Sequence, residues 1–165
     1  MNQTQNEKFR ERLEDFDTAV LITHAHGELR SRPMAIAGVD ADCGMWFFTS
    51  KESAKVHEIE RDTRVNIVCQ HGWSACVCAN GYASLERDLT LIERLWSVAF
   101  QVWFPRGATD PDIVLIHVRL EKGEYWDNTG LNRFSYAYES VKAIVTGKKP
   151  QVKEGEQHGK IDLGR

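Results

Sequence analysis

The sequence predicts a mainly β protein, an antiparallel barrel with a few flanking helices. About seven short segments rich in β-branched or aromatic residues follow one another along the 165 residues. Tight turns join most of them and few helical segments lie between them, which favours an antiparallel barrel over a βαβ layout. The length fits one domain with enough chain to bury a core.

Residue periodicity places the expected elements. Phe9, Leu13 and Phe16 recur at helical spacing and predict a first helix over 5–16. The other segments of helical composition are 53–62, 89–104 and 134–145. The segments expected to be strands are 18–24, 28–36, 45–50, 64–70, 74–86, 113–120 and 124–127, the last two as a hairpin around Lys122 and Gly123. Residues 1–146 are the predicted domain, and the Lys-, Gly- and Glu-rich residues 147–165 are expected to form a flexible tail.

Charge and cysteine content narrow the classes of function. A net charge of −3 argues against a nucleic-acid binder, which is usually basic. No apolar run is long enough to span a bilayer and the N-terminus is too polar for a signal peptide, so we expect a cytoplasmic location without a membrane partner. The cysteines have no CxxC pairing and are expected to be reduced; they are Cys43, Cys69, Cys76 and Cys78.

Two arginines on one strand face raise the question of their counter-ion. In a strand over 28–36, Arg30 and Arg32 point to the same side, where like charges repel unless an anion lies between them. Pro33 cannot donate a hydrogen bond to a neighbouring strand. This strand is therefore an edge, a bulge, or open to a ligand at that point.

A phosphate is one candidate for the anion. The residues that can converge with Arg32 are Thr49, Ser53 and Lys55, beside the free N–H groups of a helix start. Guanidinium, ammonium, hydroxyl and helix N–H groups together suit a phosphate. The alternative is that Arg30 and Lys55 form ordinary surface ion pairs with Glu28 or Glu58, and spacing alone rates the two interpretations about equal.

Other conspicuous residues have ordinary structural interpretations. His24 and His26 offer two metal ligands, but no third ligand is obvious nearby, so turn histidines are favoured and no metal site is expected. His117 alternates with apolar residues, as a core or solvent-side histidine does. An aromatic series has helical spacing that suits packing in the core or a dimer interface, although Trp103 could touch a cofactor at an interface; it comprises Trp96, Phe100, Trp103 and Phe104.

One long segment resembles a known family. Residues 32–59, RPMAIAGVDADCGMWFFTSKESAKVHEI, resemble the pyridoxamine 5′-phosphate oxidase-like, FMN-binding split-barrel superfamily, and within it the general stress protein 26 branch. The shared features are an Arg-rich strand, a Gly-Val-Asp turn, a strand that ends in an aromatic residue and Thr, and Ser-x-Lys at a helix start. Residues 103–127, WFPRGATDPDIVLIHVRLEKGEYWD, also resemble that branch, and the likeness covers residues 10–145.

The resemblance implies a six-stranded antiparallel split β-barrel that dimerises and holds FMN, or alternatively FAD, at the dimer interface. The positions that it assigns to the cofactor are Arg32 and Lys55 for the phosphate, the backbone of Pro33, Met34 and Ala35 along the isoalloxazine ring, Phe48 and Thr49 as the aromatic–Thr pair, and Trp126 approaching the flavin. Arg30 has no firm counterpart in the family. The FMN phosphate would then be the anion that the arginines require.

Departures from the true pyridoxamine phosphate oxidases concern the substrate. Those enzymes follow the Glu-aromatic-Trp segment with an Arg-x-His pair, whereas Ser135 stands here where the histidine is expected, and Ala75 and Cys76 replace an Arg-Gln pair. The prediction is therefore an FMN-binding flavoprotein, an oxidoreductase with a small-molecule redox partner but not a pyridoxamine phosphate oxidase. The alternatives are a non-enzymatic flavin carrier or stress-response flavin sensor, or a haem or deazaflavin binder on the same fold.

Overall fold

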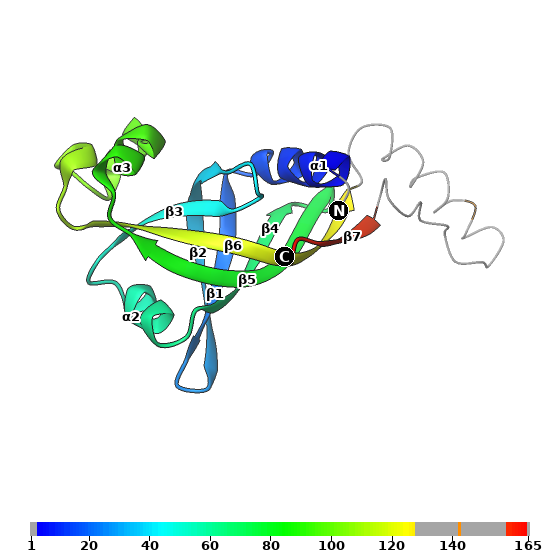
Figure 1. The fold of residues 1–165 in the computed structure, drawn as a ribbon, viewed down its shortest axis with the longest axis horizontal. Helices are drawn as coiled ribbons and strands as arrows, with labels where there is room; N and C mark the ends of the chain where they lie inside the picture. The colour runs from blue at the N-terminus through cyan, green and yellow to red at the C-terminus, as the bar shows by residue number, and fades with distance from the viewer. Residues whose placement is uncertain (1–2, 128–141, 143–157, 165) are drawn as a thin grey trace.

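The computed structural model describes residues 3–127, 142 and 158–164, and its architecture is a closed antiparallel barrel (Figure 1). The sheet order is β3-β2-β1-β4-β5-β6-β7, and an additional pairing of β3 with β6 closes the first six strands. The strands are β1 (Thr18–Ala25), β2 (Glu28–Val39), β3 (Met45–Ser50), β4 (Arg64–His71), β5 (Ala75–Glu86), β6 (Ile113–Asp127) and β7 (His158–Asp162). The mainly β class and the six-stranded barrel are confirmed.

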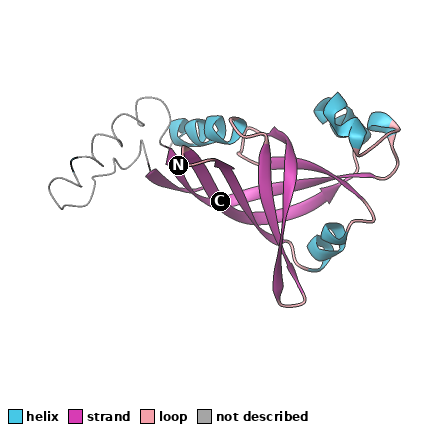
Figure 2. Cartoon of the chain, turned by 180° about the vertical axis from the view of Figure 1, so that it is seen from behind, coloured by secondary structure: helices cyan, strands magenta, loops and turns pink. Residues whose placement is uncertain are grey.

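Helices flank the barrel without separating most of its strands (Figure 2). The α-helices are α1 (Gln3–Glu14), α2 (Ala54–Arg61) and α3 (Leu89–Leu95), and two 3-10 turns follow, η1 (Val98–Val102) and η2 (Gly107–Thr109). The apolar residues of α1 at helical spacing, Phe9 and Leu13, are fully buried and join the barrel core. None of the described helices is long and apolar enough to cross a membrane.

The core follows from the period-two pattern of the strands. Along β1, Ala19, Leu21 and Thr23 are buried while the residues between them are partly exposed. A second, smaller apolar cluster lies outside the barrel, where α3, η1 and η2 cover β3 and β6. Its buried members are Phe48, Ile92, Phe100, Phe104, Ile113 and Leu115. This cluster forms one wall of the candidate site described below.

The expected helix over 89–104 is wrong beyond Leu95. Trp96 and Ser97 are extended, and the Ser97 side chain accepts a hydrogen bond from the backbone N–H of Ala99 at the start of η1. The Trp96 ring meets the Phe48 ring edge to face, with 5.6 Å between centroids. Packing of the aromatic side chains against β3 and a local serine cap therefore override the helical spacing.

Two expectations near the C-terminus also need correction. Residues 113–127 form one continuous strand, not a hairpin, because β6 stays paired with β5 through a register shift at Asn80 and Gly81. The expected flexible tail is ordered at His158–Asp162, which pairs with β6 as β7. The helix expected over 134–145 and the Asn132–Ser135 segment lie outside the described residues, apart from position 142.

Candidate functional site

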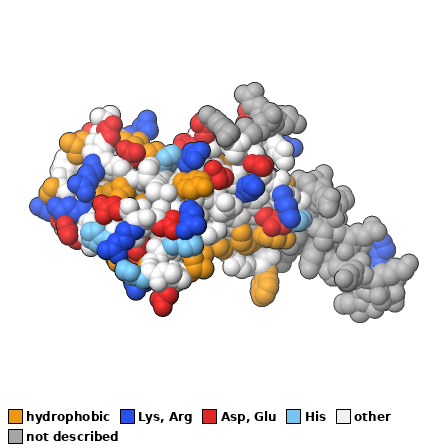
Figure 3. Space-filling model, turned by 60° about the horizontal axis from the view of Figure 1, so that its bottom comes forward, with side chains coloured by type: hydrophobic (Ala, Val, Ile, Leu, Met, Phe, Trp, Pro, Cys, Tyr) orange, Lys and Arg blue, Asp and Glu red, His pale blue; other side chains and the backbone are white. Residues whose placement is uncertain are grey.

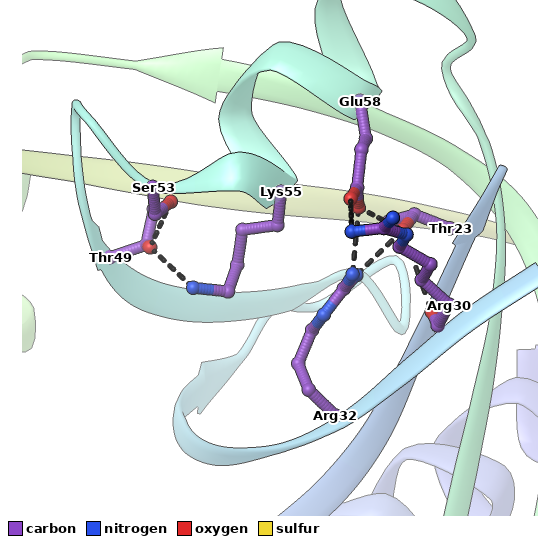
Figure 4. A network of polar contacts seen from close by, with 7 residues as sticks. All are labelled: Thr23, Arg30, Arg32, Thr49, Ser53, Lys55 and Glu58. Atoms are coloured by element: carbon purple, nitrogen blue, oxygen red, sulfur yellow. Dashed lines mark hydrogen bonds and ion pairs between the residues drawn. The ribbon is translucent and has the colours of Figure 1, made fainter. Parts of the chain in front are cut away.

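The anion between the two arginines is a carboxylate of the chain itself (Figure 4). Glu58 lies on α2, is almost fully buried, and accepts a hydrogen bond from Arg32 Nη2 at 2.7 Å. Arg30 Nη1 lies 3.8 Å from the other carboxylate oxygen. The Arg30 part of the ion-pair alternative is thus correct, and Arg32 shares the same partner. The phosphate is not needed to explain why the two arginines lie together.

Strand register places the remaining member of this network. Thr23 on β1 pairs with Arg30 on β2, so its hydroxyl lies between the arginine side chains and α2. The hydroxyl donates to Glu58 Oε2 at 2.5 Å and accepts from Arg32 Nη1 at 2.6 Å. Burial of the Glu58 carboxylate opposes its ionisation. The hydrogen bonds from Thr23 and Arg32 and the arginine charges outweigh that effect and lower the pKa of Glu58 below its usual value.

A second polar group lies beside the first, where β3 ends and α2 begins. Lys55 Nζ donates to Thr49 Oγ1 at 3.1 Å, and Thr49 Oγ1 lies 2.9 Å from Ser53 Oγ. Ser53 is the N-cap residue of α2, but its side chain makes no capping hydrogen bond to the helix. The hydroxyl therefore faces Thr49, and it does not satisfy the N–H groups at the helix start.

Lys55 lacks an anionic partner in the described part of the chain. No carboxylate there lies within ion-pair distance of its ammonium group. Burial of the ammonium and then the charge of Arg32 lower the pKa of Lys55, and the opposing charge of Glu58 has a smaller effect. Two cations that disfavour one another, with hydroxyls beside them, form a site that an added anion would stabilise.

A cavity of about 480 Å³ opens next to Lys55. Its walls are mainly apolar, from β2, Phe48 and the aromatic residues of the η1 region, including Trp103 with 75% of its surface exposed. The sequence-predicted site residues that line it are Pro33, Met34, Ala35, Phe48, Thr49, Ser53 and Lys55. Arg32 does not line the cavity but stands in the polar network beside it.

The β2 segment along this cavity has one open side. Pairing of β2 with β3 begins only at Ile36, opposite Phe47, whereas Pro33, Met34 and Ala35 pair with β1 alone. Proline is tolerated where a strand edge lacks a neighbour, which explains its presence in the middle of a strand. Backbone polar groups on this edge are therefore available to a bound molecule.

Trp126 is the one predicted site residue that the structure places elsewhere. It lies on β6, stacks on His158 with 5.2 Å between ring centroids, and lines a separate cavity with Arg12 and His71. Within one chain it is not part of the site around Lys55. Sequence reasoning missed Thr23, and it gave Glu58 only as one of two ordinary ion-pair partners. The signal for Glu58 was the unbalanced pair of arginines.

The two histidines of the first hairpin lie at the end of β1 and in the turn that follows it. His26 adopts a positive φ of 53° in the β1–β2 turn, and its Nε2 accepts a hydrogen bond from Arg61 at 3.2 Å. Among the described residues, no group of three or more His, Cys, Asp or Glu side chains is arranged to hold a metal ion. His117 is partly buried, stacks on Trp46 and bonds to Asp40 at 2.9 Å.

Comparison with known proteins places these features in a family. The family described as pyridoxamine 5′-phosphate oxidase-like matches residues 4–151, most of the chain. The chain belongs to this family. No curated protein matches it.

Several solved structures share the fold. A protein from Jannaschia sp. CCS1 that bears the name general stress protein 26 is 22% identical, with a TM-score of 0.74 over 98% of this chain and 99% of that one. General stress protein 26 from Bacillus anthracis is 24% identical, with a TM-score of 0.67 over 73% and 92%. A general stress FMN/FAD binding protein from Xanthomonas citri is 25% identical, with a TM-score of 0.66 over 78% and 92%.

Proposed function

We propose that this protein binds FMN in the cavity beside Lys55 and acts as a flavin-dependent oxidoreductase. The observation that carries the proposal is the Lys55 ammonium, which is half-buried, close to Arg32, and without a carboxylate partner in the described residues. A cation in that position is stabilised by a phosphate. The structurally similar protein from Xanthomonas citri, which is named a general stress FMN/FAD binding protein, supports the choice of ligand.

The cavity fits both ends of FMN. Lys55, the hydroxyls of Thr49 and Ser53, and the start of α2 supply donors for the phosphate, with the Arg32 charge beside them. The open edge of β2 and the aromatic wall around Phe48 form a mainly apolar slot for a planar ring.

The flavin would supply the hydride or electron chemistry, and this chain would supply binding, orientation and exclusion of water. The described residues that line the cavity include no Asp, Glu or His. Within that part of the chain, Lys55 is the one ionisable side chain at the cavity. This lining also favours the second candidate, a non-enzymatic flavin carrier, and turnover of NAD(P)H by the flavin-loaded protein distinguishes the two.

A second copy of the chain would complete the site. Trp126, 39% exposed, lies on the outer side of β6 and does not line the cavity beside Lys55 of the same chain. A groove of about 690 Å³ runs over the neighbouring outer faces of β4, β5 and β6 and includes the exposed Leu29. We propose that two copies pack over this groove and that the Trp126 of one approaches the flavin of the other.

The phosphate assignment is tested by titrating FMN and riboflavin, which lacks the phosphate. Lys55→Ala should weaken FMN binding by about 1.5–3 kcal/mol, ten- to hundredfold, and leave riboflavin binding nearly unchanged. Lys51→Ala is the matched control, because Lys51 lies four residues earlier and pairs with Asp112 at 3.0 Å. Equal losses for FMN and riboflavin would show that Lys55 serves the ring or the fold instead.

The dimer is tested by light scattering of the flavin-loaded protein. A dimer at micromolar concentration, with weaker flavin binding in Trp126→Ala, is the expected result. A monomer that retains its flavin would refute the shared site.

A further inference from the structure

Two of the free cysteines, Cys76 and Cys78, lie on the same outward-facing side of β5. Side chains alternate along this strand, so Val77 and Ala79 point into the barrel core while the two thiols are partly exposed. Their Sγ atoms lie 3.8 Å apart, within hydrogen-bond distance for sulfur. Figure 3, which brings the lower side of Figure 1 forward, shows hydrophobic side chains at the surface among charged ones. Partial exposure is therefore not what distinguishes the two thiols; they are distinguished because they face each other.

Core packing explains the other two cysteines but not this pair. Cys43 and Cys69 belong to the barrel core, where a thiol serves as a small apolar side chain. Cys78 instead lines the outer groove of about 690 Å³ described above. Cys76 lines the cavity of about 340 Å³ that also contains Trp126. This cavity gives small molecules a second approach to the pair, besides the groove over which we propose that two copies pack.

The β5 backbone holds the two residues at a spacing that a disulfide can span. Residues two apart on a strand advance by about 6.4–6.8 Å, and Cα atoms joined by a disulfide usually lie about 4.4–6.8 Å apart. β5 is paired with β4 on one side and with β6 on the other along this stretch, which fixes its extended backbone. A disulfide at the long end of the range is strained, and small thiols reduce strained disulfides readily.

We propose that Cys76 and Cys78 form a redox-active dithiol that hydrogen peroxide oxidises to an intrachain disulfide. The Cys78 thiolate attacks one peroxide oxygen; the O–O bond breaks, and the products are a Cys78 sulfenic acid and, after protonation, water. The Cys76 sulfur then attacks the Cys78 sulfur, so that an S–S bond forms, the S–O bond breaks and a second water leaves with the Cys76 proton. The two sulfurs together lose two electrons to the peroxide, and a small thiol such as glutathione returns them by exchange.

The order of the two steps follows from the contact between the thiols. Burial and then the charge of Cys78 raise the pKa of Cys76 to about 11, so Cys76 keeps its proton and donates it toward the Cys78 sulfur. The thiolate and not the thiol is the nucleophile, which makes Cys78 the attacking residue and Cys76 the resolving one. None of these steps involves the flavin, so the proposal is independent of the FMN site.

Counting thiols in the full-length protein tests the proposal. Brief treatment of the native protein with peroxide, then catalase, then alkylation after unfolding should lower the number of free thiols from four to two. Peptide mapping should place the new bond between Cys76 and Cys78, and millimolar glutathione should restore both thiols. Cys43 and Cys69 are the internal control, and they should stay reduced because they are buried in the core.

Two single variants separate the steps. Cys76→Ser should stop at the Cys78 sulfenic acid, which dimedone traps, whereas Cys78→Ser should form no disulfide and give much less dimedone adduct. The inference is overturned if the wild type keeps all four thiols under conditions that oxidise free glutathione, or if glutathione cannot reverse the bond. A bond between two chains, a bond to Cys69, or equal dimedone labelling of the two variants would also overturn it. The wild-type result decides alone if a variant does not fold.

Discussion

Replacing Glu58 by glutamine should destabilise the protein and at the same time strengthen the binding of a phosphate. Glu58 Oε2 accepts hydrogen bonds from both Thr23 and Arg32. A neutral amide oxygen keeps one acceptor but loses the charge, and each bond then drops from the charge-assisted range by about 1 kcal/mol. The exposed Arg30 pair adds little. The expected loss is about 2 kcal/mol, or a melting temperature lower by about 4–8 °C.

The pH dependence of that loss identifies its cause. Because the pKa of Glu58 is lowered in the folded protein, its ionised form stabilises the fold above the unfolded-state pKa. That contribution disappears as pH falls through the folded-state pKa, where wild-type Glu58 becomes neutral too. Urea unfolding of wild type and Glu58→Gln should therefore differ by about 2 kcal/mol near neutral pH, and the two should converge as the pH falls through the folded-state pKa of Glu58.

Glu58→Gln should strengthen phosphate binding although it weakens the fold. A carboxylate beside Arg32 repels an incoming phosphate, so Glu58→Gln should raise the preference for FMN over riboflavin several-fold. Glu58→Ala should lower that preference instead, because it also removes the acceptor that positions Arg32. A difference in stability that does not shrink as the pH is lowered would contradict the charge argument. A lower FMN preference in the glutamine variant would contradict competition between the Glu58 carboxylate and the phosphate.

Three further predictions follow from particular contacts. The pKa of Lys55, lowered by burial and by Arg32, should rise when phosphate or FMN binds, and NMR titration of its side chain reports this directly; an unchanged pKa would place the anion elsewhere. Gly123→Ala should cost about 1–3 kcal/mol in thermal unfolding, because a Cβ there would lie 2.6 Å from Phe9 Cζ. Burial raises the pKa of Cys69 to about 12 and that of Cys43 to about 11, so both thiols should resist alkylation near neutral pH until the protein unfolds, and rapid native-state labelling would contradict this.

The barrel was predictable because its determinants are local. Alternating apolar residues define β1 and β4, and the aromatic segment at 45–50 defines β3. The juxtaposition of Lys55, Thr49 and Ser53 was predictable for a similar reason, since all three lie within seven residues around one strand-to-helix turn. Short sequence separation leaves few ways to arrange such groups.

The errors arise where distant packing decides the local structure. Helical spacing at 89–104 could not reveal that Trp96 turns toward Phe48, nearly fifty residues earlier in the chain. The residues around Gly123 look like a turn, yet the close approach of Phe9 and Ile161 makes glycine necessary in a continuous strand. Pairing of His158–Asp162 with β6 was likewise invisible, because its partner lies more than thirty residues away.

The role of Glu58 shows why a correct question about the sequence received an incomplete answer. Two arginines on one strand face do require an anion, but burial decides which one they take, and the sequence does not show that Glu58 is buried. Once that carboxylate holds Arg32, the cation that still lacks an anion in the described residues is Lys55. The family resemblance assigned both Arg32 and Lys55 to phosphate binding. In the structure the two differ. Arg32 is already paired with Glu58, whereas Lys55 has no carboxylate partner among the described residues. The loss of FMN affinity relative to riboflavin affinity should therefore be larger in Lys55→Ala than in Arg32→Ala. Titration of both single variants with FMN and riboflavin measures this, and a larger loss in Arg32→Ala would refute the argument.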